Sequence, residues 1–211
     1  NVINPMTVID EYGSDALRMG ILEGRTAGIN RGYDERKVKE ARNFCNKLWN
    51  IARFIEDKIG ENHTLKVDPK PTSASDHWIL YKLQHTTKSL STSLEKYQVS
   101  GAYDTLYHFV WDDFADWYIE ASKVQFNPGV ISYVLESVLK IAHPFAPFVT
   151  ETIWQTLEWE DNESLLINQS WSKSTHYSKE KVEEFESIRS IVTEIRQIIK
   201  ALQLGRKPNL Y

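Results

Sequence analysis

The stretch that decides the fold is Ala41–Phe54, which reads ARNFCNKLWNIARF. It is long enough for almost four turns of α-helix. Basic residues, asparagines and aromatic rings are interleaved in it without a single acid, although the whole chain has a formal net charge of −4. A helix of this composition needs two unlike sides, and the neighbouring sequence shows how they divide.

One side of this helix is apolar. At about 100° per residue, apolar residues spaced alternately three and four apart fall on a single stripe. The stripe consists of Val38, Ala41, Cys45, Leu48, Ala52, Ile55 and Ile59. This spacing is typical of a helix that packs on other helices. Asp34 is a good N-cap and Gly60 a good stop, so we expect one long helix between them.

The opposite side is polar and basic. A sector of roughly 60° holds five side chains by the same helical arithmetic; they are Arg36, Asn43, Lys47, Asn50 and Phe54. From Arg36 to Arg53 the sequence has six Lys or Arg and one acid, Glu40, a net charge of +5. Solvated helix faces usually mix acids with bases, and asparagine is a poor helix former. We expect Phe54 to expose its ring on this side.

These residue types suit RNA. Arg and Lys neutralise phosphates, asparagine amides read base edges, and a phenylalanine ring stacks on an unpaired base. Stacking requires a splayed base, which favours single-stranded or looped RNA over a duplex. The residues alone leave a second interpretation open, in which this side is a buried polar interface or an ordinary surface.

The rest of the chain also predicts helices. Caps, prolines and apolar periodicity predict them over residues 5–12, 14–24, 75–97, 99–125, 127–143, 147–157 and 177–204. LLINQSW, residues 165–171, is interpreted as a short strand. The predicted fold class is therefore all-α, a helical bundle of about five helices.

Composition narrows the function classes. The chain has 211 residues, of which 41% are hydrophobic and 26% charged, as expected for a packed soluble core. Its acidic balance argues against a protein that coats nucleic acid with its whole surface. The single cysteine, Cys45, excludes an intrachain disulfide and suits the reducing cytoplasm. No apolar run approaches the roughly 18 residues of a membrane span. Because the chain starts with Asn1, we interpret it as a piece of a longer protein.

Several segments resemble class I aminoacyl-tRNA synthetases. Residues 1–18, NVINPMTVIDEYGSDALR, are similar to the segment that follows the ATP-site loop of that family. RNFCNKLWNIARF, DHWIL, WDDFADWYIE and HPFAPFVTETIW then occur in the family's order, at about its spacing. The resemblance covers roughly residues 1–172 and is closest to the valyl members, with the isoleucyl members as the alternative. SWSKS, residues 170–174, departs from the pattern, since a proline commonly follows the tryptophan.

The resemblance implies a fold and a partner. The fold is the anticodon-binding helical bundle, and the partner is the anticodon stem-loop of tRNA(Val), with no role for DNA or a membrane. The full-length enzyme would attach valine to tRNA with ATP and Mg²⁺. Its catalytic domain lies outside this chain, so we expect no catalytic residue, cofactor or metal here. The implied division is a stem-contact segment at 1–32, the bundle at 33–160, and at 161–211 a connector and a helix leading toward a C-terminal coiled-coil arm.

The resemblance also assigns residues. Arg36, Lys47 and Phe54 match anticodon contacts of the valyl enzymes, and Phe54 would be the stacking ring. Asn43, Asn50 and Arg53 are added from the helical face. Tyr12, Asp15 and Arg18 would brace the catalytic loop or the tRNA stem, and Arg25 and Arg31 would touch the stem backbone.

Other constellations favour structural roles. His108, Asp112 and Asp116 share a helical face, but acids that pair with the Lys or Arg of a neighbouring helix are commoner than metal ligands. His143, next to a proline, is interpreted as a hydrogen-bonded structural residue, and Cys45 as part of the core. A helical protein-interaction scaffold, with its basic side on an acidic partner, remains the rival function.

Overall fold

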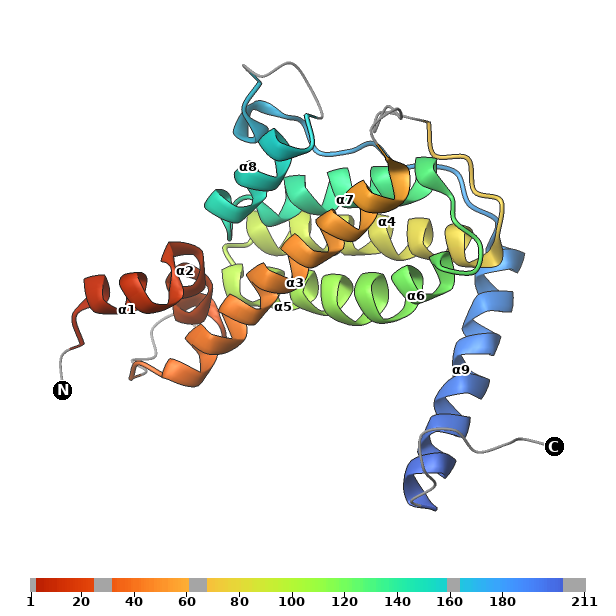
Figure 1. Cartoon of the computed structure of the whole chain (residues 1–211), viewed down its shortest axis with the longest axis horizontal. Helices are drawn as coiled ribbons and strands as arrows, with labels where there is room; N and C mark the ends of the chain where they lie inside the picture. Colours follow the sequence, from red (N-terminus) through yellow and green to blue (C-terminus); the bar gives the residue numbers. More distant parts are fainter. Residues whose placement is uncertain (1–2, 25–31, 61–67, 159–163, 203–211) are drawn as a thin grey trace.

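The computed structural model describes residues 3–24, 32–60, 68–158 and 164–202 of the chain. Within these ranges every regular element is helical, which confirms the all-α prediction. Figure 1 shows α4, α7 and the segment from α5 to α6 as neighbouring, roughly parallel rods. α3 crosses them obliquely, α1 and α2 lie at one end of the molecule, and α9 projects from the other.

The N-terminal helices pack on α3. α1 (Pro5–Tyr12) begins where the Asn4 side chain accepts a hydrogen bond of 3.0 Å from the Met6 N–H. α2 (Ser14–Leu22) approaches α3 so closely that a Cβ placed on Gly20 would lie 2.8 Å from Val38 Cγ2. This contact fixes the N-terminal segment against the bundle.

α3 (Glu35–Ile59) forms as the sequence predicts. Asp34 caps it by accepting a hydrogen bond from the Arg36 N–H, and Gly60 ends it with φ at +73°. The predicted apolar stripe is buried, except that Cys45 is only half-buried. Phe44 and Ile51 are buried as well, although they lie outside that stripe. The buried side of α3 is therefore wider than its periodicity indicated.

A buried carboxylate joins three parts of the bundle. α4 (Ala74–Glu95) starts with a capping box between Ser73 and Asp76. The Asp76 carboxylate also accepts hydrogen bonds of 2.7 Å from the Tyr118 hydroxyl and from the Asn127 amide. Asn127 itself caps α7 (Pro128–Ala142). One acid thus aligns the starts of α4 and α7 with the end of the central rod.

The central rod contains an unforeseen change of helix type. Predicted as one α-helix over 99–125, it consists of α5 (Val99–His108), the π-helix η1 (Phe109–Tyr118) and α6 (Ile119–Ser122). π-helices are rare, and apolar periodicity over a short window does not separate them from α-helices.

The C-terminal part corrects one prediction. α8 (Pro147–Thr156) is followed by the 3₁₀ helix η2 (Leu166–Asn168), so the strand predicted at 165–171 is wrong. The Leu166 N–H donates to the Glu151 carboxylate at 3.0 Å, which satisfies it without a strand partner. α9 (Lys179–Ala201) buries only Val182 and Phe185 and then extends away from the bundle (Figure 1).

Candidate nucleic-acid interface

The solvent-facing side of α3 carries most of the predicted contact residues. Arg36, Asn43, Asn50 and Arg53 are exposed. Lys47 is half-buried, and so is Phe54, which packs against the core. The prediction that Phe54 exposes its whole ring is therefore wrong. Part of the side chain packs against the core and part remains accessible.

The width of the buried side explains this correction. Phe44 packs on Tyr107 of α5, with ring centroids 5.6 Å apart, and its burial extends the apolar side of α3 toward α5. The accessible side of α3 is consequently turned away from α5, relative to the predicted one. Arg42 and Asn46 are exposed within it. The predicted contact residues omitted both, although the absence of acids around them in the sequence was a signal.

Arg36 is paired with the acid that caps its own helix. Its Nε lies 3.2 Å from Asp34 Oδ1 and its Nη2 lies 3.1 Å from Asp34 Oδ2. These hydrogen bonds lower the pKa of Asp34 below its usual value. The Arg36 side chain is nevertheless 85% exposed, so a phosphate can reach its remaining donors. The predicted acid-free side thus has an acid at its N-terminal edge.

Lys47 is paired with an acid from a different element. Its ammonium nitrogen lies 3.3 Å from Asp116 Oδ1 and 4.9 Å from the ring centroid of Trp111. Both partners belong to η1. Trp111 in turn stacks on Tyr107, with centroids 5.6 Å apart and the ring planes 8° from parallel. Lys47 is therefore held at a defined position at the boundary between α3 and η1.

The three predicted residues of α1 and α2 make contacts within the chain. The Tyr12 hydroxyl donates to Glu35 Oε1 at 2.8 Å, and Arg18 donates to the Pro144 carbonyl at 3.2 Å. Asp15 is buried, and its carboxylate accepts hydrogen bonds from the backbone N–H groups of Phe148 and Val149. Each contact ties the N-terminal segment to the bundle. The predicted residues Arg25 and Arg31 lie outside the described residues.

The discounted constellations have structural partners. His108 pairs with Asp112 at 2.8 Å, while Asp116 faces Lys47. The His143 ring lies 2.9 Å from the Thr150 hydroxyl, which confirms its hydrogen-bonded role. Within the described ranges, no three His, Cys, Asp or Glu residues gather as they would around a metal ion.

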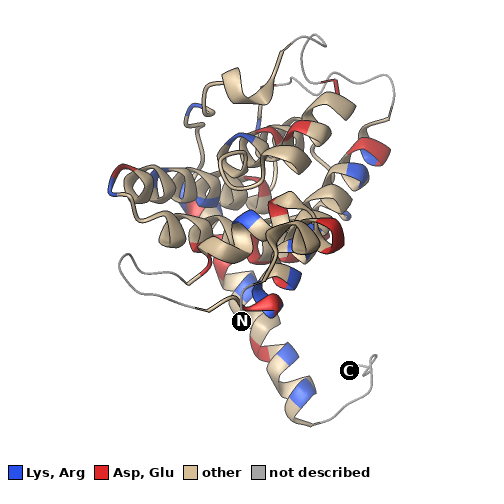
Figure 2. Cartoon of the chain, turned by 90° about the vertical axis from the view of Figure 1, so that its left-hand side faces the viewer, with Lys and Arg blue, Asp and Glu red and all other residues tan. Residues whose placement is uncertain are grey.

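Figure 2 shows that basic and acidic residues are interspersed over the helices as a whole. The uneven charge of α3 is thus a local feature of one helix face. Its exposed guanidinium and amide groups can contact phosphates and base edges.

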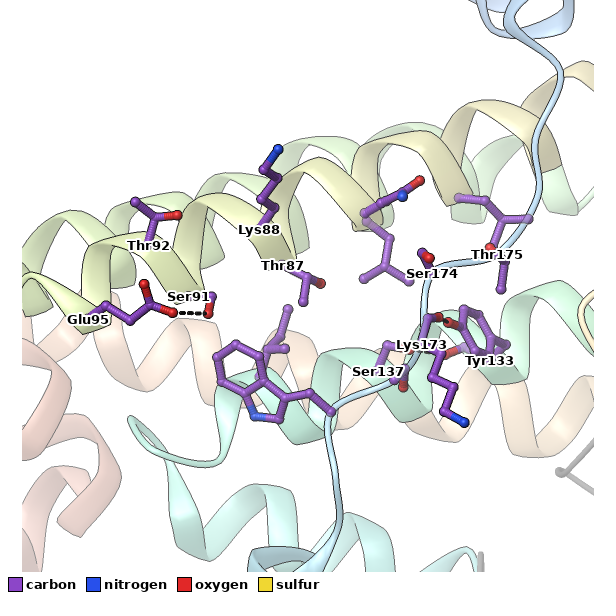
Figure 3. Close-up of a pocket in the computed structure, with 16 residues that line it drawn as sticks. Thr87, Lys88, Ser91, Thr92, Glu95, Tyr133, Ser137, Lys173, Ser174 and Thr175 are labelled. Atoms are coloured by element: carbon purple, nitrogen blue, oxygen red, sulfur yellow. Dashed lines mark hydrogen bonds between the residues drawn. The ribbon is translucent and has the colours of Figure 1, made fainter.

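A cavity of about 420 Å³ lies elsewhere, between α4, α7 and the connector 171–175 (Figure 3). Three of the hydroxyl groups in its wall have hydrogen-bond partners. The Tyr133 hydroxyl donates to the Lys173 carbonyl, Ser137 to the Tyr133 carbonyl at 2.8 Å, and Ser91 to Glu95 at 3.3 Å. The first of these bonds holds the connector against α7, while the other two lie within α7 and α4.

The all-α bundle and the basic side of α3 are consistent with an RNA-binding protein, and comparison with known proteins gives the family. Residues 76–210 match the family model described as the anticodon-binding domain of tRNA ligase, so the chain belongs to that family. α3 precedes the matched region.

Among curated proteins, the chain is similar to valine–tRNA ligases. It is 37% identical to that of Staphylococcus saprophyticus over 98% of the chain, and 37% identical to that of Staphylococcus epidermidis over 93%. The chain spans 24% of the length of each of these relatives.

A solved structure shares the fold. The leucyl enzyme LeuRS, agnB2 of Agrobacterium radiobacter K84, in a ternary complex with tRNA and LeuAMS, superposes with a TM-score of 0.69. The match covers 86% of this chain and 22% of that one, at 18% identity. None of the helices in the described ranges has the length and apolar character that a membrane span requires.

Proposed function

We propose that this chain is the part of a valine–tRNA ligase that binds tRNA(Val) by its anticodon loop. The observation that carries the proposal is the exposed, basic and amide-rich side of α3, on a bundle of the anticodon-binding family. The 37% identity to valine–tRNA ligases supports valine as the amino acid.

Recognition would combine three kinds of contact. Arg36, Lys47 and Arg53 would neutralise loop phosphates, while Asn43 and Asn50 would hydrogen-bond base edges. The accessible part of the Phe54 ring would stack on an unpaired base, whereas its buried part holds its orientation. Arg36 and Phe54 are about 27 Å apart along α3, so the contacts would extend over several nucleotides.

The remaining assignments concern the longer protein. We propose that Tyr12, Asp15 and Arg18 hold the segment 1–32 in place beside a catalytic domain, and that Arg25 and Arg31 touch the tRNA stem. The segment 33–160 would be the recognition bundle, and 161–211 would lead to further chain. ATP and Mg²⁺ would serve the ligase reaction of the full-length enzyme in the cytoplasm.

Phe54 provides the test. Binding of the chain to stem-loops with valine and isoleucine anticodons is measured by fluorescence anisotropy. Replacing Phe54 with Leu retains an apolar side chain against the core but removes the stacking ring. We expect about 5- to 100-fold weaker binding of the valine loop, the range for loss of one stacked base.

Leu165→Ala, an exposed apolar residue beside η2, is the control and should leave binding unchanged. A preference for the isoleucine loop would assign the chain to the isoleucyl enzymes. Equal and unaffected binding of both loops would favour a protein-interaction scaffold instead.

A further inference from the structure

Two residues of η1 form a holder around the Lys47 ammonium group. Asp116 contributes a carboxylate oxygen at 3.3 Å and Trp111 an aromatic ring at 4.9 Å. The two partners differ in chemistry, one an ion pair and one a cation–π contact. Each restricts a different direction of motion of the flexible lysine side chain.

The π-helix is what brings the two partners together. Trp111 and Asp116 are five residues apart, which in an α-helix would separate their side chains by about 140°. A π-helix closes its hydrogen bonds from residue i to residue i+5, so residues five apart lie slightly more than one turn apart and on the same side. η1 therefore directs both side chains toward α3.

We propose that Trp111 and Asp116 are positioning residues that fix Lys47 for discrimination between anticodon loops. This inference rests on the proposed function. An unrestrained lysine would follow a phosphate to many positions, whereas a held ammonium accepts only a loop whose anionic or acceptor group arrives at one place. The Lys47 and Asp116 side chains are 31% and 51% exposed, so an incoming group has access to the pair.

Asp116 also opposes incorrect loops. Its carboxylate repels a phosphate that approaches beside Lys47 instead of at it, which adds a repulsive element to the attractive one. Removing this charge should therefore have two opposite effects. Binding of any RNA at low salt should strengthen slightly, while the preference for the correct loop should fall.

Asp116→Asn and Asp112→Asn make a matched pair for the test. Both remove one charge from neighbouring positions of η1, and their side chains are 51% and 54% exposed. Asp112 faces His108 rather than Lys47. The measured quantity is the ratio of the binding constants for stem-loops with valine and isoleucine anticodons, on the whole 211-residue chain. Circular dichroism verifies that each variant is folded.

We expect Asp116→Asn to reduce this ratio about two- to fivefold, the range of an exposed ion pair, and Asp112→Asn to leave it unchanged. In a Lys47→Met background, Asp116→Asn should change the ratio by a smaller factor, because only the repulsion of phosphates by Asp116 is then removed. Trp111→Leu should lower the ratio like Asp116→Asn, and Trp111→Phe less so, because it retains a ring.

Two results would overturn the proposal: equal changes in the ratio for Asp116→Asn and Asp112→Asn, or an undiminished effect of Asp116→Asn without Lys47. A wild-type chain that binds both loops equally would refute anticodon discrimination itself. That outcome is seen with the wild-type chain alone. Failure of the proposed function can therefore be distinguished from failure of the positioning role of Trp111 and Asp116.

Discussion

At the scale of single residues, burial decides which chemistry remains available. Cys45 lies on the predicted apolar stripe, and desolvation there raises the pKa of its thiol to about 12. Asp15 is also buried, but its carboxylate has partners there, because two backbone N–H groups of α8 donate to it. A charged group at a helix N-terminus is stabilised both by these bonds and by the helix dipole.

Cys45 should therefore be unreactive in the folded chain. Only the thiolate reacts with alkylating agents, and its fraction grows about tenfold per pH unit below the pKa. At pH 8, iodoacetamide should label the native chain at least about a hundredfold more slowly than the urea-denatured chain. Mass spectrometry over time measures both rates. Similar rates in the two states would contradict the burial of this thiol.

At the scale of elements, helix junctions depend on a few close contacts. Arg189 of α9 lies over the rings of Trp78 and Trp117, with its Cζ 4.6 and 4.9 Å from their centroids. Trp78 donates to Glu186 at 2.6 Å. These contacts anchor the first half of α9 on α4 and η1. The contact between α2 and α3 depends instead on the absence of a side chain at Gly20, because a Cβ there would meet Val38.

Gly20→Ala should loosen the contact between α2 and α3. The added Cβ would meet Val38 Cγ2 at 2.8 Å and Val38 Cα at 2.9 Å, and backbone atoms cannot move aside cheaply. We expect a loss of about 1–3 kcal/mol in the free energy of unfolding, measured in urea.

Gly101→Ala is the control for helix propensity. Nothing lies within 4 Å of a Cβ at this position in α5. The substitution should stabilise the chain by up to about 1 kcal/mol. If both variants were stabilised, the result would contradict the close contact between Gly20 and Val38.

At the scale of the whole molecule, a net acidic chain presents one locally basic helix side. Under the proposed function, the formal charge of −4 would repel RNA at long range, while the α3 side would attract it at contact. This arrangement would restrict RNA to that face and would make the affinity depend on ionic strength.

Binding of the valine stem-loop should weaken as salt rises, because each phosphate contact releases counterions. The slope of log K against log[salt] should be about −0.7 to −0.9 per contact, so Arg53→Gln should reduce its magnitude by nearly one. Lys173→Gln, in the connector far along the chain from α3, is the control and should retain the wild-type slope. Anisotropy titrations at several KCl concentrations give these slopes. An unchanged slope for Arg53→Gln would remove that residue from the contact surface.

The sequence by itself determined most of the helices and the centre of the buried side of α3. Asp34 and Asn127 cap helices with their own side chains, and the spacing of Val38 to Ile59 follows the helical period. These signals are local, since a cap bonds within three residues and a stripe depends only on neighbouring turns.

Only the tertiary structure decided which α3 side chains stay accessible and which helices meet. The half-burial of Phe54, the Lys47–Asp116 pair and the capping of α8 by Asp15 all depend on elements distant in sequence. Lys47 and Asp116 are 69 positions apart, and Asp15 and Val149 are 134 positions apart. The Lys47–Asp116 pair also depends on the π-helix η1, which contains Asp116. No local pattern encodes such contacts, because packing of whole helices brings the side chains together.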